Sequence, residues 1–157
     1  LRLWRNQPHF RRFFRETGEI SQDRQTEWYE QVVISDPRVI MFAIEELGEG
    51  RLLGACGLCY IDRINRSADF SIYLGADDLY IDEVYAVDAG RQLLKYGFEE
   101  QNLHRIWAEI YDFDEAKKRL FATLGFTLDG RHREAHWTEG EWVDSLFYGV
   151  LRRDFAG

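Results

Sequence analysis

The spacing of apolar residues changes along this chain, and that change limits the folds open to it. Three short apolar runs, at 39–44, 52–61 and 70–74, are bounded by turn signals and predict strands. Apolar and small residues then recur at the helical period over 86–98. A further apolar and aromatic run at 105–111 predicts another strand. This order predicts an α+β fold with a mixed, mostly antiparallel sheet flanked by helices.

Further elements are expected at both ends of the chain. Pro8 can begin a helix, because its missing N–H is not needed in the first turn, and this helix should run to Thr17. A second helix is expected over 22–33. Two strands at 126–132 and 141–151 should form a closing hairpin.

One more helix is predicted over 113–124. Asp112 and Glu115 have the spacing of a capping box at its start. Gly125 follows its last turn, where glycine commonly ends a helix.

Length and charge limit the classes of function. With 157 residues, 45% of them hydrophobic, the chain should form one domain over 1–157 with a sizeable core. It begins at Leu1 and contains one methionine, Met41, so the natural N-terminus is expected to be missing. The longest apolar run, Leu52 to Ile61, is shorter than the ~18 residues of a membrane span, so no membrane partner is expected. A net charge of -8 argues against a nucleic-acid partner.

Two short motifs invite a metal or redox function. Cys56 and Cys59 form a C-x-x-C pair within a strand, where residues three apart face opposite sides. Two free thiols in a reducing, cytoplasmic compartment are therefore expected. His132, Glu134 and His136 lack the H-E-x-x-H spacing of a zinc protease, so we expect no metal.

The most specific patterns lie in the second half of the chain. They are Leu93 to Ile106, Asp114-Glu115-Ala116 through Leu124-Gly125-Phe126, and the paired stretches 130–134 and 140–144. With these stretches the chain resembles, over nearly its whole length, the GNAT superfamily of acetyl-CoA-dependent N-acetyltransferases. Within it, the subgroup resembled holds ribosomal-protein N-terminal, spermidine and amino-sugar-nucleotide acetyltransferases. The opening Trp4-Arg5-Asn6 is most like the amino-sugar branch.

The resemblance implies a fold and a reaction. Strand 70–74 should splay from strand 105–111 and open a V-shaped slot for acetyl-CoA. The enzyme, an acyltransferase, would move an acetyl group to a primary amine by direct attack of the amine on the thioester. The acceptor would be a small molecule or peptide, namely an amino-sugar nucleotide, a polyamine or a polypeptide N-terminus. Exposed strand edges make a homodimer an expected assembly.

The resemblance also implies which residues bind acetyl-CoA. Backbone groups at the end of strand 70–74 would hold the pantetheine arm, and a helix N-terminus would receive the pyrophosphate. Three residues of the next helix complete the set. The implied residues are Ile72, Tyr73, Leu74, Val84, Tyr85, Ala86, Val87, Asp114, Lys117 and Phe121.

The chain departs from the family pattern at two places. The family's pyrophosphate loop reads Q/R-x-x-G-x-G/A, whereas residues 81–86 read Ile-Asp-Glu-Val-Tyr-Ala, and only Ala86 fits. Acidic side chains crowd this stretch and would oppose a phosphate: Asp77, Asp78, Asp82, Glu83 and Asp88. Phe121 stands where the family has a tyrosine that protonates the thiolate. A non-catalytic GNAT-fold binding module therefore remains an alternative.

Catalytic and substrate-binding candidates follow from the same comparison. Asp69, at the start of the strand beside the slot, is the candidate base, and Tyr111 is the candidate proton donor in place of Phe121. The candidates for holding the acceptor are Arg5, Asn6, Asp62, Asn65, Glu134 and His136.

Overall fold

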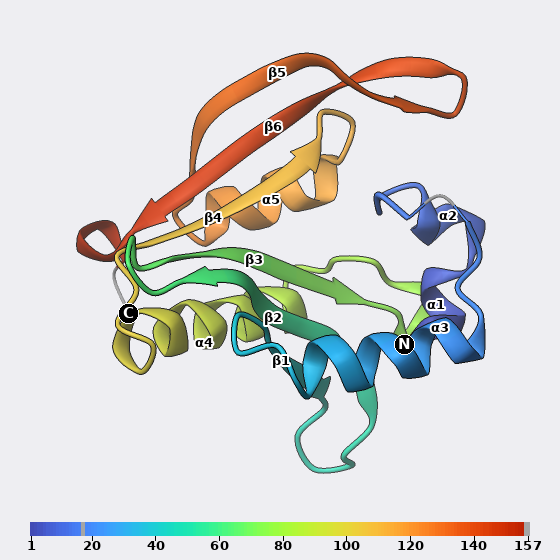
Figure 1. Cartoon of the computed structure of the whole chain (residues 1–157), viewed down its shortest axis with the longest axis horizontal. Coiled ribbons are helices and arrows are strands. Elements are labelled where there is room, and N and C mark those ends of the chain that lie inside the picture. The colour runs from blue at the N-terminus through green and yellow to red at the C-terminus, as the bar shows by residue number, and fades with distance from the viewer. Residues whose placement is uncertain (17, 156–157) are drawn as a thin grey trace.

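A computed structural model describes residues 1–16 and 18–155 of the chain. One sheet carries the strands in the order β1-β2-β3-β4-β6-β5 (Figure 1). The strands are β1 (Ile40–Glu45), β2 (Leu52–Asp62), β3 (Ser67–Leu74), β4 (Arg105–Tyr111), β5 (Thr127–Thr138) and β6 (Glu141–Leu151). The helices are α1 (Arg2–Arg5), α2 (Pro8–Arg11), α3 (Gln22–Trp28), α4 (Tyr85–Glu99) and α5 (Glu115–Thr123), with shorter turns η1 (Tyr29–Val33), η2 (Ala76–Asp78) and η3 (Arg152–Asp154). The predicted α+β order is confirmed.

The two central strands, β3 and β4, are parallel, whereas every other neighbouring pair is antiparallel. Their pairing covers three residue pairs and ends at Asp69 opposite Trp107. Beyond that point β3 stays paired with β2 as far as Leu74, and β4 stays paired with β6 as far as Tyr111. In Figure 1 the two arrows separate toward the side where α1 and α2 lie. The predicted splay of the central strands is thus confirmed.

The alternation of β3 sends its side chains to two different layers. Phe70 and Ile72 are buried in the core with residues of α4 and α5. Tyr73 points to the other face, where its ring meets Phe14 edge-on at 5.3 Å. The small residues of α4 let it approach closely: a Cβ on Gly90 would lie 2.7 Å from a methyl carbon of Leu124. Asp69 shares the Tyr73 face, since side chains two apart in a strand point the same way.

The N-terminal helices differ from their predicted extents. The helix expected from Pro8 ends at Arg11, and the predicted end at Thr17 lies outside the described residues. Beyond the helix, the Phe13 ring stacks on Tyr80 at 4.2 Å, so tertiary contacts replace the helical spacing there. The helix expected over 22–33 changes at Tyr29 into a wider π-helical turn.

The ends of α5 correct one prediction and confirm another. The capping residue is Asp114, whose carboxylate accepts the Lys117 N–H at 3.0 Å, so the predicted Asp112–Glu115 box is wrong. Asp114 is fixed in this capping position because it is buried and also accepts a hydrogen bond from a side chain distant in sequence, described below. Gly125 has φ +82 and ends the helix as predicted.

Candidate active site

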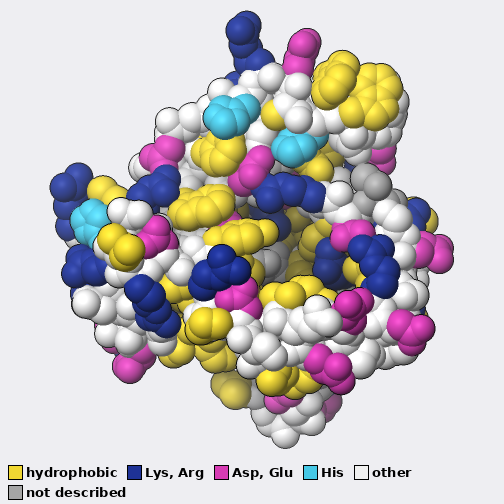
Figure 2. Space-filling model, viewed as in Figure 1, with side chains coloured by type: hydrophobic (Ala, Val, Ile, Leu, Met, Phe, Trp, Pro, Cys, Tyr) yellow, Lys and Arg dark blue, Asp and Glu magenta, His cyan; other side chains and the backbone are white. Residues whose placement is uncertain are grey.

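A cavity of about 530 Å³ lies where β3 and β4 separate, on the face covered by α1 and α3. Its walls include residues of β2, β3, β4 and α5. Figure 2 shows this face hollowed, with Lys and Arg side chains around the hollow. The lining residues with charged side chains are Arg5, Arg15, Glu16, Asp36, Arg38, Asp69, Glu109 and Lys117.

Asp69 lies at the point where the two strands part. It is the last β3 residue paired with β4, and it pairs across β2 with Cys59. Burial raises the pKa of Asp69 to about 7, while Lys117 and Arg15 pull it down and Glu109 adds to the rise. A carboxylate with this pKa can accept a proton near neutral pH and release it again.

Glu109 of β4 is a second carboxylate in the cavity, and the sequence reasoning missed it. Burial would raise its pKa, but hydrogen bonds from Ser145 and His136, together with the charges of Arg15 and His136, outweigh that effect and hold the pKa below its usual range. Arg15 also pairs with it, and the His136 Nε2 atom lies 3.2 Å from its Oε1. Glu109 therefore stays ionised and holds Arg15, His136 and Ser145 in place. The sequence feature that could have indicated it is a single acidic residue within an apolar strand.

Two candidates from the sequence meet beside Glu109. The His136 and Tyr111 rings lie 5.1 Å apart, and Tyr111 also stacks on Phe113 at 5.3 Å. Burial raises the pKa of Tyr111, so its hydroxyl stays protonated at neutral pH. A protonated hydroxyl is what a proton donor at this place requires.

Lys117 and Arg5 enter the cavity from opposite sides. Lys117 belongs to α5, on the far side of the sheet, yet it lines the cavity, so its side chain passes through the gap between β3 and β4. Burial lowers its pKa, and the nearby Asp114 and Asp69 oppose that shift. The Arg5 guanidinium lies 4.6 Å above the Phe14 ring. Lys117, which was expected to bind acetyl-CoA, thus lies beside Asp69.

Tyr80 closes the open end of the gap. Its carbonyl accepts the Leu74 N–H at 2.8 Å, and its hydroxyl donates to Asp114 at 2.8 Å. The residue therefore joins the end of β3 to the start of α5. Leu74 and Asp114 were both expected to bind acetyl-CoA. In this conformation both are hydrogen-bonded to Tyr80.

Asp82 fills a similar role at the N-terminus of α4. Its carboxylate accepts the Tyr85 N–H at 3.1 Å and the Ala86 N–H at 2.7 Å. The first N–H groups of a helix have no partner within the helix, and at other helix N-termini such donors bind phosphate. The acidic departure in the sequence thus has a structural explanation, because the chain supplies its own anion there.

The other residues assigned to acetyl-CoA are placed as follows. Phe121 is 1% exposed and packs against Phe126 and Tyr148, in the core. Ile72 is also in the core, whereas Val84 is 68% exposed just before α4. Val87, in the first turn of α4, is buried.

Four acceptor-binding candidates lie outside the cavity, engaged in local structure. The Asn6 side chain makes two hydrogen bonds to the Ile20 backbone, at 2.9 and 2.8 Å. Asp62 and Asn65 bond to each other and build the turn between β2 and β3. Glu134 donates its N–H to Asp144 in the β5–β6 hairpin.

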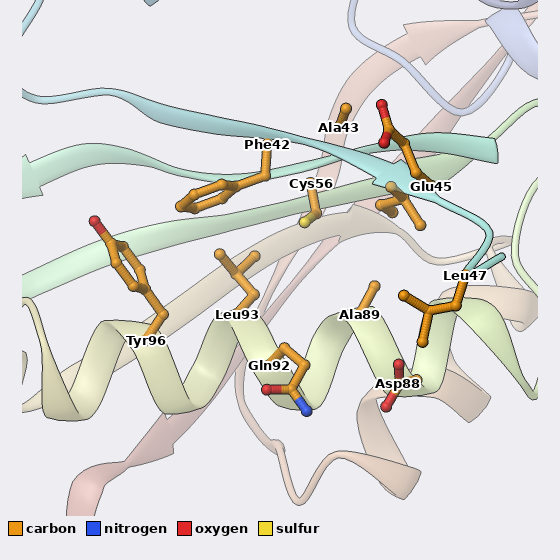
Figure 3. A pocket seen from close by; sticks show the side chains of 11 residues that line it. Phe42, Ala43, Glu45, Leu47, Cys56, Asp88, Ala89, Gln92, Leu93 and Tyr96 are labelled. Atoms are coloured by element: carbon orange, nitrogen blue, oxygen red, sulfur yellow. The ribbon is translucent and has the colours of Figure 1, made fainter. Parts of the chain in front are cut away.

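A second cavity, of about 480 Å³, lies between β1 and α4 (Figure 3). The Leu93 and Tyr96 side chains point from α4 toward β1, and Tyr96 meets Phe42 edge-on at 5.1 Å. Cys56 lines this cavity and Cys59 lines the one beside Asp69, so the two thiols face opposite sides of the sheet as predicted. Both cysteines are free.

Residues 1–16 and 18–155 contain no cluster of three His, Cys, Asp or Glu side chains arranged to hold a metal ion. In the same range, every helix is too short or too polar to cross a membrane.

Comparison with protein families gives one match. The model described as "Acetyltransferase (GNAT) domain" matches residues 1–127. The Bacillus licheniformis protein named "Uncharacterized N-acetyltransferase p20" is 29% identical over 106 residues, which are 68% of this chain and 58% of that protein. The putative ribosomal N-acetyltransferase YdaF of Bacillus subtilis is 26% identical over 111 residues, 71% of this chain and 60% of that protein. The chain thus spans less than two thirds of the length of these two relatives.

Solved structures show the same fold. A spermidine N-acetyltransferase from Vibrio cholerae, in complex with CoA and spermine, superposes with a TM-score of 0.88 at 24% identity. The match covers 98% of this chain and 88% of that one. A mutant form of the Vibrio cholerae enzyme SpeG gives a TM-score of 0.76 at 26% identity, over 84% of this chain and 76% of that one.

Proposed function

The chain belongs to the acetyltransferase (GNAT) domain family, and on that premise we propose that it transfers an acetyl group from acetyl-CoA to a primary amine. The observation that carries the proposal is the position of Asp69. Its carboxylate, with a pKa of about 7, lies in a cavity at the point where β3 and β4 separate.

The chain's own part in this reaction is the movement of protons. An aliphatic amine has a pKa of about 10 and arrives as an ammonium ion, so it must lose a proton before it can attack a carbonyl. Asp69 would accept that proton, and Glu109, already paired, would keep its charge. The Tyr111 hydroxyl would donate a proton to the leaving thiolate. Acetyl-CoA supplies the activated acetyl group.

The backbone N–H groups near the gap are donors of the kind that acetyl-CoA needs. In this conformation they are hydrogen-bonded to other groups of the same chain. The Asp82 carboxylate stands in for a phosphate at α4, and the Tyr80 carbonyl stands in for an amide carbonyl at Leu74. The proposal therefore requires the segment between β3 and α4 to move when acetyl-CoA binds. Asp82 would release the α4 N–H groups, and Tyr80 would release Leu74 and Asp114.

The proposed acceptor belongs to one of three classes: amino-sugar nucleotides, polyamines or polypeptide N-termini. Names of related proteins support the last two, since they include a putative ribosomal N-acetyltransferase and spermidine acetyltransferases. A cytoplasmic location is part of the proposal, since two unbonded thiols are compatible with a reducing compartment. The strands at the edges of the sheet, β1 and β5, would be the surfaces for a homodimer.

The hydrogen bonds of Tyr80 and Asp82 within the chain favour a second candidate function. If Tyr80 and Asp82 never leave their partners, the fold serves as a non-catalytic binding module. In that case the cavity beside Asp69 binds an amine without acetylating it.

An acetyl-transfer assay separates the two functions. The wild type and the Asp69→Asn variant are incubated with acetyl-CoA and a panel of the three amine classes, and the release of free CoA thiol is followed between pH 5.5 and 9. We expect wild-type kcat/KM to rise through pH 7, as Asp69 loses its proton. Asp69→Asn should lower kcat at least about 100-fold and remove that rise, because general-base catalysis has this magnitude.

The control is Glu99→Gln, which removes a carboxylate from the exposed end of α4 and should leave kcat unchanged. Absence of wild-type thiol release with every amine would favour the binding module. Full activity in Asp69→Asn would remove Asp69 from the role of base.

A further inference from the structure

Two positive side chains in the Asp69 cavity have no counter-ion. Arg15 pairs with Glu109, and Arg38 pairs with Asp36 at 2.9 Å. Among the described residues, neither Arg5 nor Lys117 has a carboxylate within the 4.0 Å of an ion pair. The two lie near enough to each other that Arg5 contributes to the lowered pKa of Lys117.

Arg5 also has a buried donor without an acceptor. Its Nε atom is shielded from solvent and has no hydrogen-bond partner among the described residues. Unmatched buried donors are uncommon in folded proteins, and this one shows that part of the Arg5 side chain is shielded from water. The Phe14 ring, 4.6 Å away, supports the guanidinium from one side. An arginine held in this way can present its donors to a phosphate or carboxylate.

The acids of the cavity do not neutralise these two cations. Glu109 is engaged by Arg15 and Ser145, and Glu16 is engaged by Arg24 at 2.8 Å. Asp36 is held by Arg38. Asp69, the remaining acid that lines the cavity, has a pKa of about 7. Asp114, which lies near Lys117 outside the lining, accepts hydrogen bonds from the Tyr80 hydroxyl and the Lys117 N–H. Arg5 and Lys117 are therefore the two lining cations that no lining carboxylate pairs with.

We propose that the acceptor is a small primary amine that also carries a phosphate or carboxylate, which Arg5 and Lys117 bind while the amino group lies at Asp69. The inference rests on the proposed function and narrows its acceptor. It selects anionic amines, such as amino-sugar phosphates or amino acids, over polyamines. A polyamine would bring further positive charge to two unpaired cations, whereas an anion would satisfy both.

Binding of matched amines tests the inference without acetyl-CoA. Calorimetry would compare glucosamine 6-phosphate with glucosamine, alanine with alaninamide, and both pairs with spermidine. We expect the member that carries the phosphate or carboxylate, in at least one pair, to bind ten-fold or more tightly than its partner without that group and than spermidine. The first pair reports on a phosphate and the second on a carboxylate.

Variants assign the preference to these side chains. Arg5→Gln should abolish it, and Lys117→Gln, which tests the second cation if Arg5→Gln does not fold, should weaken it. Arg91→Gln, at an exposed position of α4, should keep it. The inference is overturned if neither pair shows a preference, if spermidine binds most tightly, or if the preference survives in both cavity variants.

The two proposals fail in different ways. An anion preference without thiol release from acetyl-CoA would contradict the transferase and leave the anion site in place. Acetylation of spermidine by a protein with no anion preference would contradict only the anion site.

Discussion

Asp69 and Glu109 are carboxylates on the same face of the sheet, and their surroundings give them opposite properties. Glu109 accepts hydrogen bonds from Ser145 and His136, and these stabilise its ionised form. Asp69 receives no comparable bond among the described residues, and burial favours its neutral form. Glu109 therefore keeps its negative charge, whereas Asp69 has a pKa that lets it exchange a proton near neutral pH.

The raised pKa of Asp69 also affects folding stability. The group has a pKa of about 7 in the folded protein against an ordinary value of 3.8. It therefore contributes stability at low pH, and that contribution is lost as pH rises from about 4 through 7. The difference corresponds to about 4 kcal/mol at most, and relaxation of the protein around the charged carboxylate reduces it to roughly 2 kcal/mol.

Chemical denaturation at pH 5 and pH 8 measures this effect. Asp69→Asn should raise the free energy of unfolding at pH 8 by roughly 2 kcal/mol relative to wild type, and by less at pH 5. The same two measurements on Glu99→Gln should show no such difference. Equal changes at both pH values for Asp69→Asn would contradict the raised pKa.

At the scale of elements, the segment between β3 and α4 determines whether the gap is open. Tyr80 connects the end of β3 to α5, and Asp82 caps α4. Both contacts use groups that, by resemblance, would bind acetyl-CoA. The acidic loop is thus a local cap that competes with a phosphate for the same N–H groups.

Removal of that cap should have opposite effects on stability and binding. Asp82→Ala should lower the free energy of unfolding by about 1 kcal/mol, because the α4 N–H groups lose their acceptor. It should also tighten binding of acetyl-CoA, since a competing anion is gone. Denaturation and calorimetric titration measure the two effects. Glu83→Ala removes an adjacent charge whose carboxylate makes no hydrogen bond to α4 among the described residues, so it should change stability less. Weaker binding by Asp82→Ala would show that Asp82 supports the ligand.

At the scale of the whole molecule, the regular elements could be predicted because their periodicity is local. The boundaries of β4 and β6 agree with prediction to the residue. The short α2 and the cap at Asp114 could not be predicted, since Tyr80, which is distant in sequence, contacts both regions. The splay of β3 from β4 followed from family resemblance, because no local pattern indicates a parallel pair.

The candidate site was predictable only in part, for a related reason. The structure brings Asp69, Arg5 and Lys117 to one cavity, with His136 near Glu109. Asn6, Asp62, Asn65 and Glu134 instead take part in local hydrogen bonds, as short polar side chains and turn backbones commonly do. Local sequence does not show which of these two uses a polar residue will have.

A crystal structure of the wild-type protein with acetyl-CoA tests the central claim most directly. We expect the acetyl thioester between β3 and β4 beside Asp69, with the Tyr80 hydroxyl no longer on Asp114 and the α4 N–H groups on a phosphate. A gap still bridged by Tyr80 between Leu74 and Asp114, at saturating acetyl-CoA, would contradict the account.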